Sequence, residues 1–203
     1  MTVRRLILRS FQSPGDVLML TAAVRDLQRA APGRFEIDVR TSAPDLWLNN
    51  PHLTRLSEGQ PGVETLEMHY PLIHQSNQRP YHFLHGYTQD LEQKLGLRIA
   101  PTEFRGDLHL SREERDDESL QKRLGIWGDY WVLVAGGKYD FTAKWWNPAS
   151  WQAVVDHFAG RVQFVQCGEK GHWHPKLTCV VDAIGKTTTR EFVRLVHRAT
   201  GVA

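Results

Sequence analysis

The chain has 203 residues, of which 41% are hydrophobic and 24% are charged, and its formal net charge is +2. This is the composition of a globular protein with one large domain or two small ones, and it excludes a general electrostatic attraction to nucleic acid. The sequence predicts no signal peptide and no membrane-spanning helix, while Cys167 and Cys179 lack the spacing of metal ligands and suit a reducing cytoplasm.

The first thirty residues predict a strand, a turn and a helix. Residues 3–9 have a buried apolar centre, residues 10–15 are rich in Ser, Pro and Gly, and apolar residues then recur at helical spacing up to Pro32. This order opens a doubly wound α/β domain, in which ligands bind at the carboxyl ends of the strands. Asp16 falls at that end of the first strand, in the first turn of the helix.

Asp16 has two interpretations. It can cap the helix N-terminus, which its position alone favours, or it can act as a catalytic carboxylate. A dinucleotide-binding site is not supported, because Gly15 stands alone where such a site needs the pattern G-x-G-x-x-G. The sequence therefore disfavours an NAD-linked enzyme.

The rest of the first half continues the α/β pattern. We expect strands at 35–40, 53–56, 63–68 and 107–110, and helices at 43–48 and 81–95. Residues 70–80 predict a loop, with histidines at positions 69, 74, 82 and 85 in and around it. Their spacing matches no common metal motif, so we interpret them as surface or substrate-facing side chains rather than metal ligands.

A capping box formed by Ser111 and Glu114 predicts a helix that runs to about residue 124. The break at 125–129 places a domain boundary there, which gives an N-terminal domain at 1–125 and a C-terminal domain at 126–203.

The second half begins as the first does, with a buried strand at 130–135 that ends in Gly136, Gly137 and Lys138. This turn is not a P-loop, because no G-x-x-x-x-G-K precedes it and Tyr139 stands where Ser or Thr should follow. We expect further strands at 161–166, 179–181 and from 201, and helices at 149–158 and 190–197, the second opened by a capping box at 188–191.

Three segments carry a resemblance to a known family. They are residues 6–27 around the Gly15-Asp16 pair, the run Asn50-Pro51-His52-Leu53, and the run Lys144-Trp145-Trp146-Asn147-Pro148. They resemble the family 9 glycosyltransferases, the ADP-heptose:lipopolysaccharide heptosyltransferases and their relatives. The resemblance implies a GT-B architecture of two Rossmann-like parallel-sheet domains, the second incomplete in this chain, with no metal ion and no cofactor.

The resemblance also implies roles for individual residues. The Asp of the Gly-Asp pair is the family's proposed general base, which maps to Asp16. Lys144 would meet the negative charge of the departing diphosphate, whereas composition alone favours a surface lysine beside two tryptophans. The other implied contacts are Gly136, Gly137, Lys138 and Glu169 on the donor side, and Ser13, Gly15 and His82 on the acceptor side.

The leading hypothesis is an inverting transfer of heptose from ADP-heptose to a lipopolysaccharide or other glycan acceptor, in the cytoplasm or at the periphery of the inner membrane. The alternative is a non-catalytic nucleotide- or sugar-binding module, or an inactive fragment of such an enzyme. The resemblance implies that the chain covers only the first part of the expected enzyme. In that case Phe192, Leu195 and Val196 should form an apolar helix face without a partner.

Overall fold

A computed structural model describes residues 2–70 and 78–203 of the chain. The chain divides into two compact α/β units, Met1–His109 and Leu110–Ala203, and each is described here by itself. The division falls earlier than the boundary expected at residue 125, because the two helices before that position pack within the second unit.

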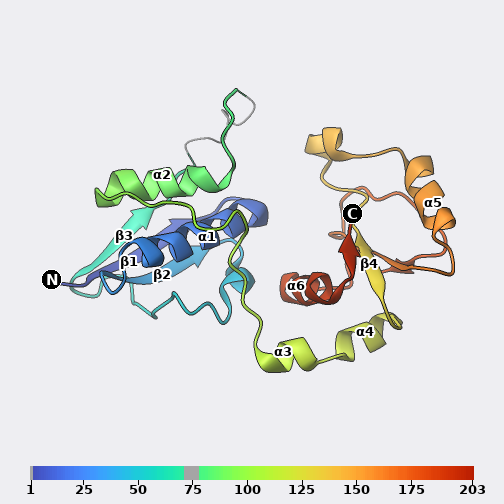
Figure 1. Ribbon diagram of the computed structural model, residues 1–203, viewed down its shortest axis with the longest axis horizontal. Helices are drawn as coiled ribbons and strands as arrows, with labels where there is room; N and C mark the ends of the chain where they lie inside the picture. Colours follow the sequence, from blue (N-terminus) through green and yellow to red (C-terminus); the bar gives the residue numbers. More distant parts are fainter. Residues whose placement is uncertain (1, 71–77) are drawn as a thin grey trace. The chain divides into compact units, whose positions relative to one another are not determined.

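The first unit is a parallel three-stranded sheet of order β2-β1-β3, in which β1 lies in the middle. Three consecutive residues of β1, Leu6, Ile7 and Leu8, are fully buried, as the apolar run predicts. Helix α1 packs against α2 (Figure 1). The elements are β1 (Arg4–Ser10), α1 (Pro14–Ala30), β2 (Phe35–Thr41), the 3₁₀ helix η1 (Pro44–Trp47), β3 (Val63–Glu67) and α2 (Leu84–Leu95).

Two strands expected in this unit, at 53–56 and 107–110, do not form. Isolated hydrogen bonds, rather than a strand ladder, hold both segments, and one of them joins the N–H of Thr54 to the carbonyl of Ile37 on β2. The N–H of Leu56 donates to the carboxylate of Asp38, and the N–H of Asp107 donates to the hydroxyl of Thr21 on α1. Both predictions were wrong because a short segment alone does not reveal whether it will form a continuous ladder with a neighbouring strand.

Helix α2 begins at Leu84, later than the expected start at residue 81, and ends as predicted at Gly96 in the left-handed conformation. Of the expected loop at 70–80, residues 71–77 lie outside the described residues, and His74 lies there with them.

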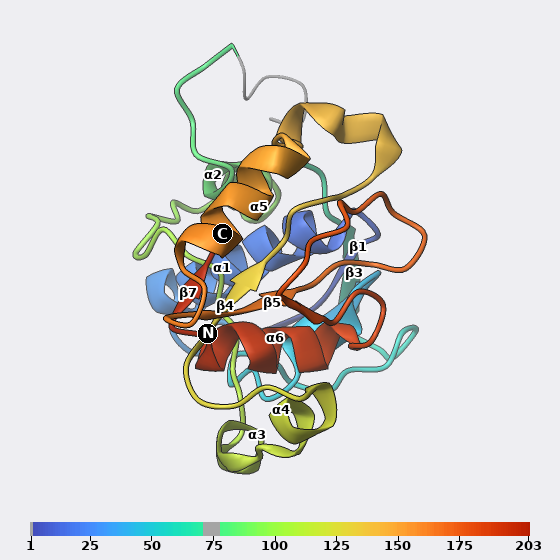
Figure 2. The same ribbon diagram turned by 90° about the vertical axis from the view of Figure 1, so that its right-hand side faces the viewer.

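The second unit is a parallel four-stranded sheet of order β6-β5-β4-β7. Helix α5 covers one face of the sheet and α6 covers the other (Figure 2). This layering confirms the α/β class. The elements are α3 (Arg112–Asp116), α4 (Ser119–Leu124), β4 (Tyr130–Leu133), η2 (Tyr139–Lys144), α5 (Pro148–His157), β5 (Gln163–Gln166), β6 (Val181–Asp182), α6 (Thr189–Arg198) and β7 (Gly201–Val202).

The single helix expected at 111–124 is two helices, α3 and α4, although the predicted capping box at Ser111 is present. The chain breaks at Asp117, whose carboxylate accepts hydrogen bonds from the N–H and hydroxyl of Ser119 and pairs with Arg194 of α6 at 2.6 Å. These donors, the Ser119 N–H first, lower the pKa of Asp117 to about 2.

A second ion pair ties α3 to α6. Arg190 binds both carboxylate oxygens of Glu114 at 2.6 Å and lowers the pKa of that carboxyl group to about 2. Such two-point contacts between a guanidinium and a carboxylate are stronger than single hydrogen bonds. They explain why α3 and α4 belong to the second unit rather than to the first.

Helix α6 has no unpartnered apolar face. Leu195 is fully buried in the core below the sheet, and Phe192 and Val196 are partly buried against the same core. The prediction of an exposed face at these three residues was therefore wrong, because the helix packs on its own sheet. Exposed apolar side chains instead occur on β4 and β7, at Trp131 and Val202.

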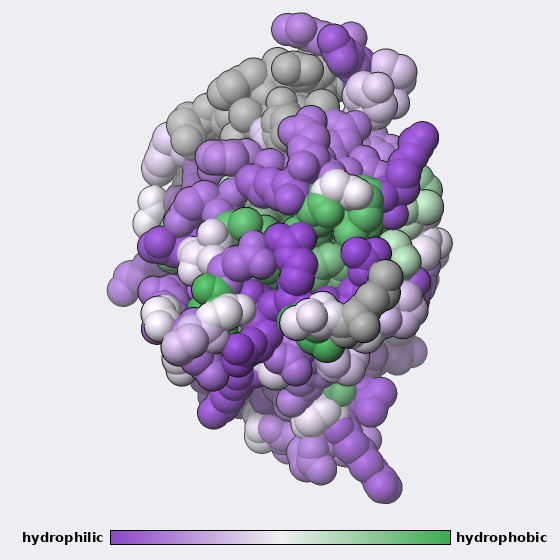
Figure 3. Space-filling model, turned by 90° about the vertical axis from the view of Figure 1, so that its left-hand side faces the viewer, coloured by the Kyte–Doolittle hydropathy of each residue, from purple (hydrophilic) through white to green (hydrophobic). Residues whose placement is uncertain are grey.

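None of the helices in the described part of the chain is long and apolar enough to cross a membrane. On the face shown in Figure 3, hydrophobic side chains are visible only in limited areas among hydrophilic ones.

Candidate functional site

Asp16 lies just beyond the carboxyl end of β1. The N-cap residue of α1 is Ser13, followed by Pro14 and Gly15, so Asp16 is the third residue of the helix. The interpretation of Asp16 as the N-cap is therefore wrong. Asp16 is partly exposed and lies near a helix N-terminus, where the helix dipole favours negative charge. No side-chain capping hydrogen bond closes this end of the helix.

Two buried tyrosines accompany Asp16 at this end of the sheet. The hydroxyls of Tyr87 and Ser10 share a hydrogen bond of 3.0 Å, and the Tyr70 ring stacks on the Tyr87 ring at 5.2 Å between centroids. Burial raises the pKa of both tyrosines, and the nearby Asp16 carboxylate raises it further. Both hydroxyls therefore stay protonated, that of Tyr87 within its hydrogen bond to Ser10.

The Tyr70 hydroxyl is buried and has no hydrogen-bond partner among the described residues. Its ring packs directly on Gly86 of α2, where an added Cβ would overlap the aromatic carbons. Neither tyrosine was predicted as a site residue, because Tyr87 fits the apolar stripe of its helix and Tyr70 begins the predicted loop. Only the fold brings both rings beside Asp16.

The residues expected on the acceptor side have modest local roles. The Ser13 side chain makes no capping bond, and a Cβ on Gly15 would meet nothing within 4 Å, so no close approach requires glycine there. The Nδ1 atom of His82 accepts the N–H of Leu84 at 3.2 Å, and the His82 ring lies edge-on to Phe104. His82 thus contacts the first residue of α2, whose N-cap residue is Phe83.

The Asn50-Pro51-His52 segment contributes to the scaffold. The Asn50 side chain donates to the carbonyl of Asp107 at 3.4 Å and accepts the His52 N–H at 2.9 Å. The His52 ring lies 3.7 Å from the Asp107 carboxylate, and burial lowers the pKa of His52. These contacts join the Asn50-Pro51-His52 segment to Asp107, near the end of the first unit.

In the second unit, the Gly136-Gly137 turn follows β4 and pairs with the segment at 172–174. Gly137 donates its N–H to the Trp173 carbonyl at 2.9 Å and accepts the Trp173 N–H at 3.1 Å. This bridge occupies the N–H of Gly137, one of the residues expected on the donor side. Gly136 faces the Trp173 carbonyl and the His174 ring, which leave no room for a Cβ.

Lys138 and Lys144 stand at the two ends of η2, and both are exposed. The residue after Lys144, Trp145, stacks on Trp173 with centroids 4.3 Å apart and planes 20° apart. This stack joins the lysine-bearing segment to the loop beside the Gly136-Gly137 turn. The structure therefore brings together the parts of the chain that hold the predicted donor-side residues.

Glu169 follows β5 and Gly168, with its side chain 74% exposed and one carboxylate oxygen 3.5 Å from Nε2 of His172. Its backbone carbonyl accepts hydrogen bonds from the N–H of His172 at 3.2 Å and from Nε2 of His174 at 2.9 Å. The loop thus fixes the backbone of Glu169 and leaves its carboxylate in solvent.

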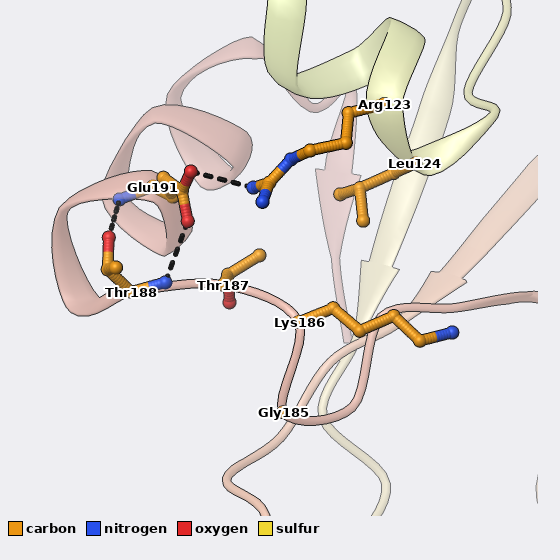
Figure 4. Close-up of a pocket in the computed structure, with 7 residues that line it drawn as sticks. All are labelled: Arg123, Leu124, Gly185, Lys186, Thr187, Thr188 and Glu191. Carbon is orange, nitrogen blue, oxygen red and sulfur yellow. Dashed lines mark hydrogen bonds and ion pairs between the residues drawn. The ribbon is translucent and has the colours of Figure 1, made fainter.

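A hollow of about 540 Å³ lies at the start of α6 (Figure 4). Its charged groups are already paired: Arg123 with Glu191 at 2.6 Å, and Lys186 with Asp182 at 3.0 Å. Thr188 and Glu191 form the predicted capping box, which occupies N–H groups at the helix N-terminus. This hollow is therefore poorly suited to a phosphate group.

In the described ranges, 2–70 and 78–203, no group of three His, Cys, Asp or Glu side chains is placed to hold a metal ion.

The fold and these sites define a protein of two α/β units with polar groups gathered beyond the carboxyl ends of parallel strands, where such folds bind their ligands.

No protein-family model and no curated protein sequence matches the chain. Solved structures do match. One is a family 9 glycosyltransferase from Veillonella parvula, with a TM-score of 0.68, 16% identity, and coverage of 98% of this chain and 74% of that one.

A second match is TibC of enterotoxigenic E. coli, described as a bacterial iron-containing dodecameric glycosyltransferase, with a TM-score of 0.67, 18% identity, and coverage of 100% of this chain and 54% of that one. A third is E. coli ADP-heptose lipopolysaccharide heptosyltransferase II, with a TM-score of 0.61, 14% identity, and coverage of 98% and 78%. Two further matched structures are TibC in complex with ADP-D-β-D-heptose and E. coli heptosyltransferase WaaC with ADP.

The chain therefore has the fold of the family 9 glycosyltransferase structures, which confirms at the level of fold the resemblance seen in its motifs. It spans between 54% and 80% of the lengths of the structures it matches.

Proposed function

We propose that this protein belongs to the family 9 glycosyltransferases and transfers heptose, with inversion, from ADP-heptose to a lipopolysaccharide-type glycan. The observation that carries the proposal is the match of nearly the whole chain to heptosyltransferase structures, together with a carboxylate at the carboxyl end of β1. Inversion follows from a single displacement, in which the acceptor hydroxyl attacks the anomeric carbon opposite the departing ADP.

Asp16 is the proposed general base. Its carboxylate is a weak base, which suffices when the acceptor hydroxyl loses its proton late, after bonding to the anomeric carbon has begun. A positioned base of this kind typically contributes about 10²–10⁴ in rate. The protonated hydroxyl of Tyr70 supplies a hydrogen-bond donor beside it, suited to orienting Asp16 or an acceptor oxygen.

Lys144 is the proposed partner of the leaving group. As the C–O bond to ADP breaks, negative charge grows on the diphosphate, and a cation held nearby stabilises that charge in the transition state. Lys138 lies at the other end of η2 and would add to the positive potential. Glu169 is the proposed partner of the ribose hydroxyls, because an ionised carboxylate readily accepts hydrogen bonds from hydroxyl groups.

The proposal invokes no metal ion and no cofactor, and it places the reaction in the cytoplasm, or at the inner membrane surface where a glycolipid acceptor would be presented. The name of one matched enzyme, E. coli ADP-heptose lipopolysaccharide heptosyltransferase II, supports this acceptor class.

Two measurements test the proposal on the 203-residue chain. Isothermal titration should show binding of ADP and ADP-heptose, and release of ADP from ADP-heptose should accelerate when a lipopolysaccharide-core acceptor is added. Binding without turnover would favour the alternative, a non-catalytic nucleotide-binding module. A chain that binds neither ADP nor ADP-heptose would overturn the proposed function.

A further inference from the structure

The ring of His174 packs against two glycines at the carboxyl ends of neighbouring strands. Its ring lies against Gly136, which follows β4, and against Gly168, which follows β5. A Cβ on Gly136 would come within 2.6 Å of Nδ1, and a Cβ on Gly168 would come within 2.7 Å of both ring nitrogens. Since any other residue at either position would displace the ring, the two glycines make room for an imidazole.

The hydrogen bonding of His174 fixes its tautomer. Nε2 lies 2.9 Å from the carbonyl oxygen of Glu169, and a carbonyl only accepts, so Nε2 carries the proton. Nδ1 is buried and has no hydrogen-bond partner among the described residues. A proton there would be a buried donor without an acceptor, which is costly. The packing around His174 therefore directs its Nε2–H at the carbonyl of Glu169.

The loop around His174 is held at further points. Trp173 forms the bridge to Gly137, and the Gln166 side chain donates to the Pro175 carbonyl at 2.8 Å. The Gly168 carbonyl accepts the Gly185 N–H at 2.8 Å. Against this fixed frame, His174 makes the side-chain hydrogen bond that sets the carbonyl of Glu169 in place.

We propose that His174 is a positioning residue for the nucleotide. Through its Nε2–H bond to the Glu169 carbonyl, it fixes the backbone of Glu169, from which the carboxylate reaches the ribose of a bound nucleoside diphosphate. This inference rests on the proposed function, because that function places the nucleotide in the second unit. If His174 only filled space, its substitution would change the stability of the protein, and it would change the affinity for all ligands equally or for none. A residue that positions Glu169 affects ligands that contain ribose.

Two substitutions separate the nitrogens of the ring. The amide nitrogen of Gln reaches the place of Nε2, whereas that of Asn reaches the place of Nδ1. His174→Gln should keep the affinity for ADP within about threefold of wild type, and His174→Asn should weaken it about tenfold, the effect of losing one hydrogen bond. Inorganic pyrophosphate, which lacks ribose, should bind wild type and both variants equally in a competition assay.

The outcomes are separable. Equal ADP affinity in the Asn variant and wild type, or a parallel loss for pyrophosphate, would overturn the positioning role while leaving the proposed function intact. A wild-type chain that binds no ADP would overturn both. Should His174→Asn fail to fold, long-range ¹H–¹⁵N spectra of the wild-type protein give an independent test. They should show His174 with a proton on Nε2, and a ring protonated only at Nδ1 would refute the proposal.

Discussion

Substitution of Arg25 by Met should strongly destabilise the first unit. Arg25 of α1 is 1% exposed, and its guanidinium pairs with the equally buried Asp26 at 3.0 Å. It also donates to the carbonyls of Glu103 and Arg105, at 2.8 and 3.0 Å. One side chain thus neutralises a buried carboxylate and fastens a segment that is distant in the sequence.

The magnitude follows from what Arg25→Met leaves behind. The Asp26 carboxylate would stay buried without its cation, and removal of one partner of a buried ion pair costs about 3–5 kcal/mol. For a unit of this size, such a loss lowers the unfolding midpoint by on the order of 10 °C. The double substitution Arg25→Met with Asp26→Leu removes the unpaired charge and should recover part of the loss.

Differential scanning calorimetry measures the effect, and Arg112→Met is the matched control. Arg112 pairs with Asp116 at 3.6 Å, but both side chains are largely exposed, at 86% and 72%. Its loss should change stability by less than about 1 kcal/mol. A midpoint for Arg25→Met within about 1 °C of wild type, or a decrease no larger than that of the control, would refute the reasoning from burial.

Three predictions concern the proposed reaction. Asp16→Asn should keep the fold, since Ser13 is the N-cap, and should lower ADP release from ADP-heptose by about 10²-fold or more; an active, folded variant would return Asp16 to a structural role. Lys144→Ala should reduce turnover more than it reduces acceptor affinity in steady-state kinetics, and an unchanged rate would exclude it from the leaving-group site. Gly86→Ala should displace the Tyr70 ring and impair turnover, whereas Gly15→Ala, whose Cβ meets nothing within 4 Å, should leave folding unaffected; equal effects on folding by circular dichroism would contradict the packing argument.

Local signals made much of the fold predictable from the sequence. The buried run of β1, the left-handed glycine after α2, and the capping boxes at Ser111 and Thr188 are each encoded within a few residues, and the structure confirms all of them. Such elements depend on backbone preference and on the periodicity of apolar side chains, both of which can be read from a short window.

The features that escaped prediction depend on contacts between distant residues. The break between α3 and α4 is stabilised by the pairing of Asp117 with Arg194, which lies 77 positions away. In the candidate site, the fold brings Tyr70 against Gly86 and near Asp16, and it packs the His174 ring against Gly136. No short sequence pattern encodes these contacts, so the roles of Tyr70 and His174 can be inferred only from the three-dimensional structure.

The Trp145–Trp173 stack gives the second unit a built-in optical reporter. Six of the seven tryptophans, all but Trp47, belong to that unit, and this pair joins the Lys144 segment to the His174 loop. Aromatic rings held in one geometry produce near-ultraviolet circular dichroism, which disappears when side-chain packing is lost. Detachment of the His174 loop from the Lys144 segment would therefore change the near-ultraviolet spectrum. The far-ultraviolet spectrum of the sheet and helices would stay almost unaltered, so the packing of the loop on that segment can be followed without any label.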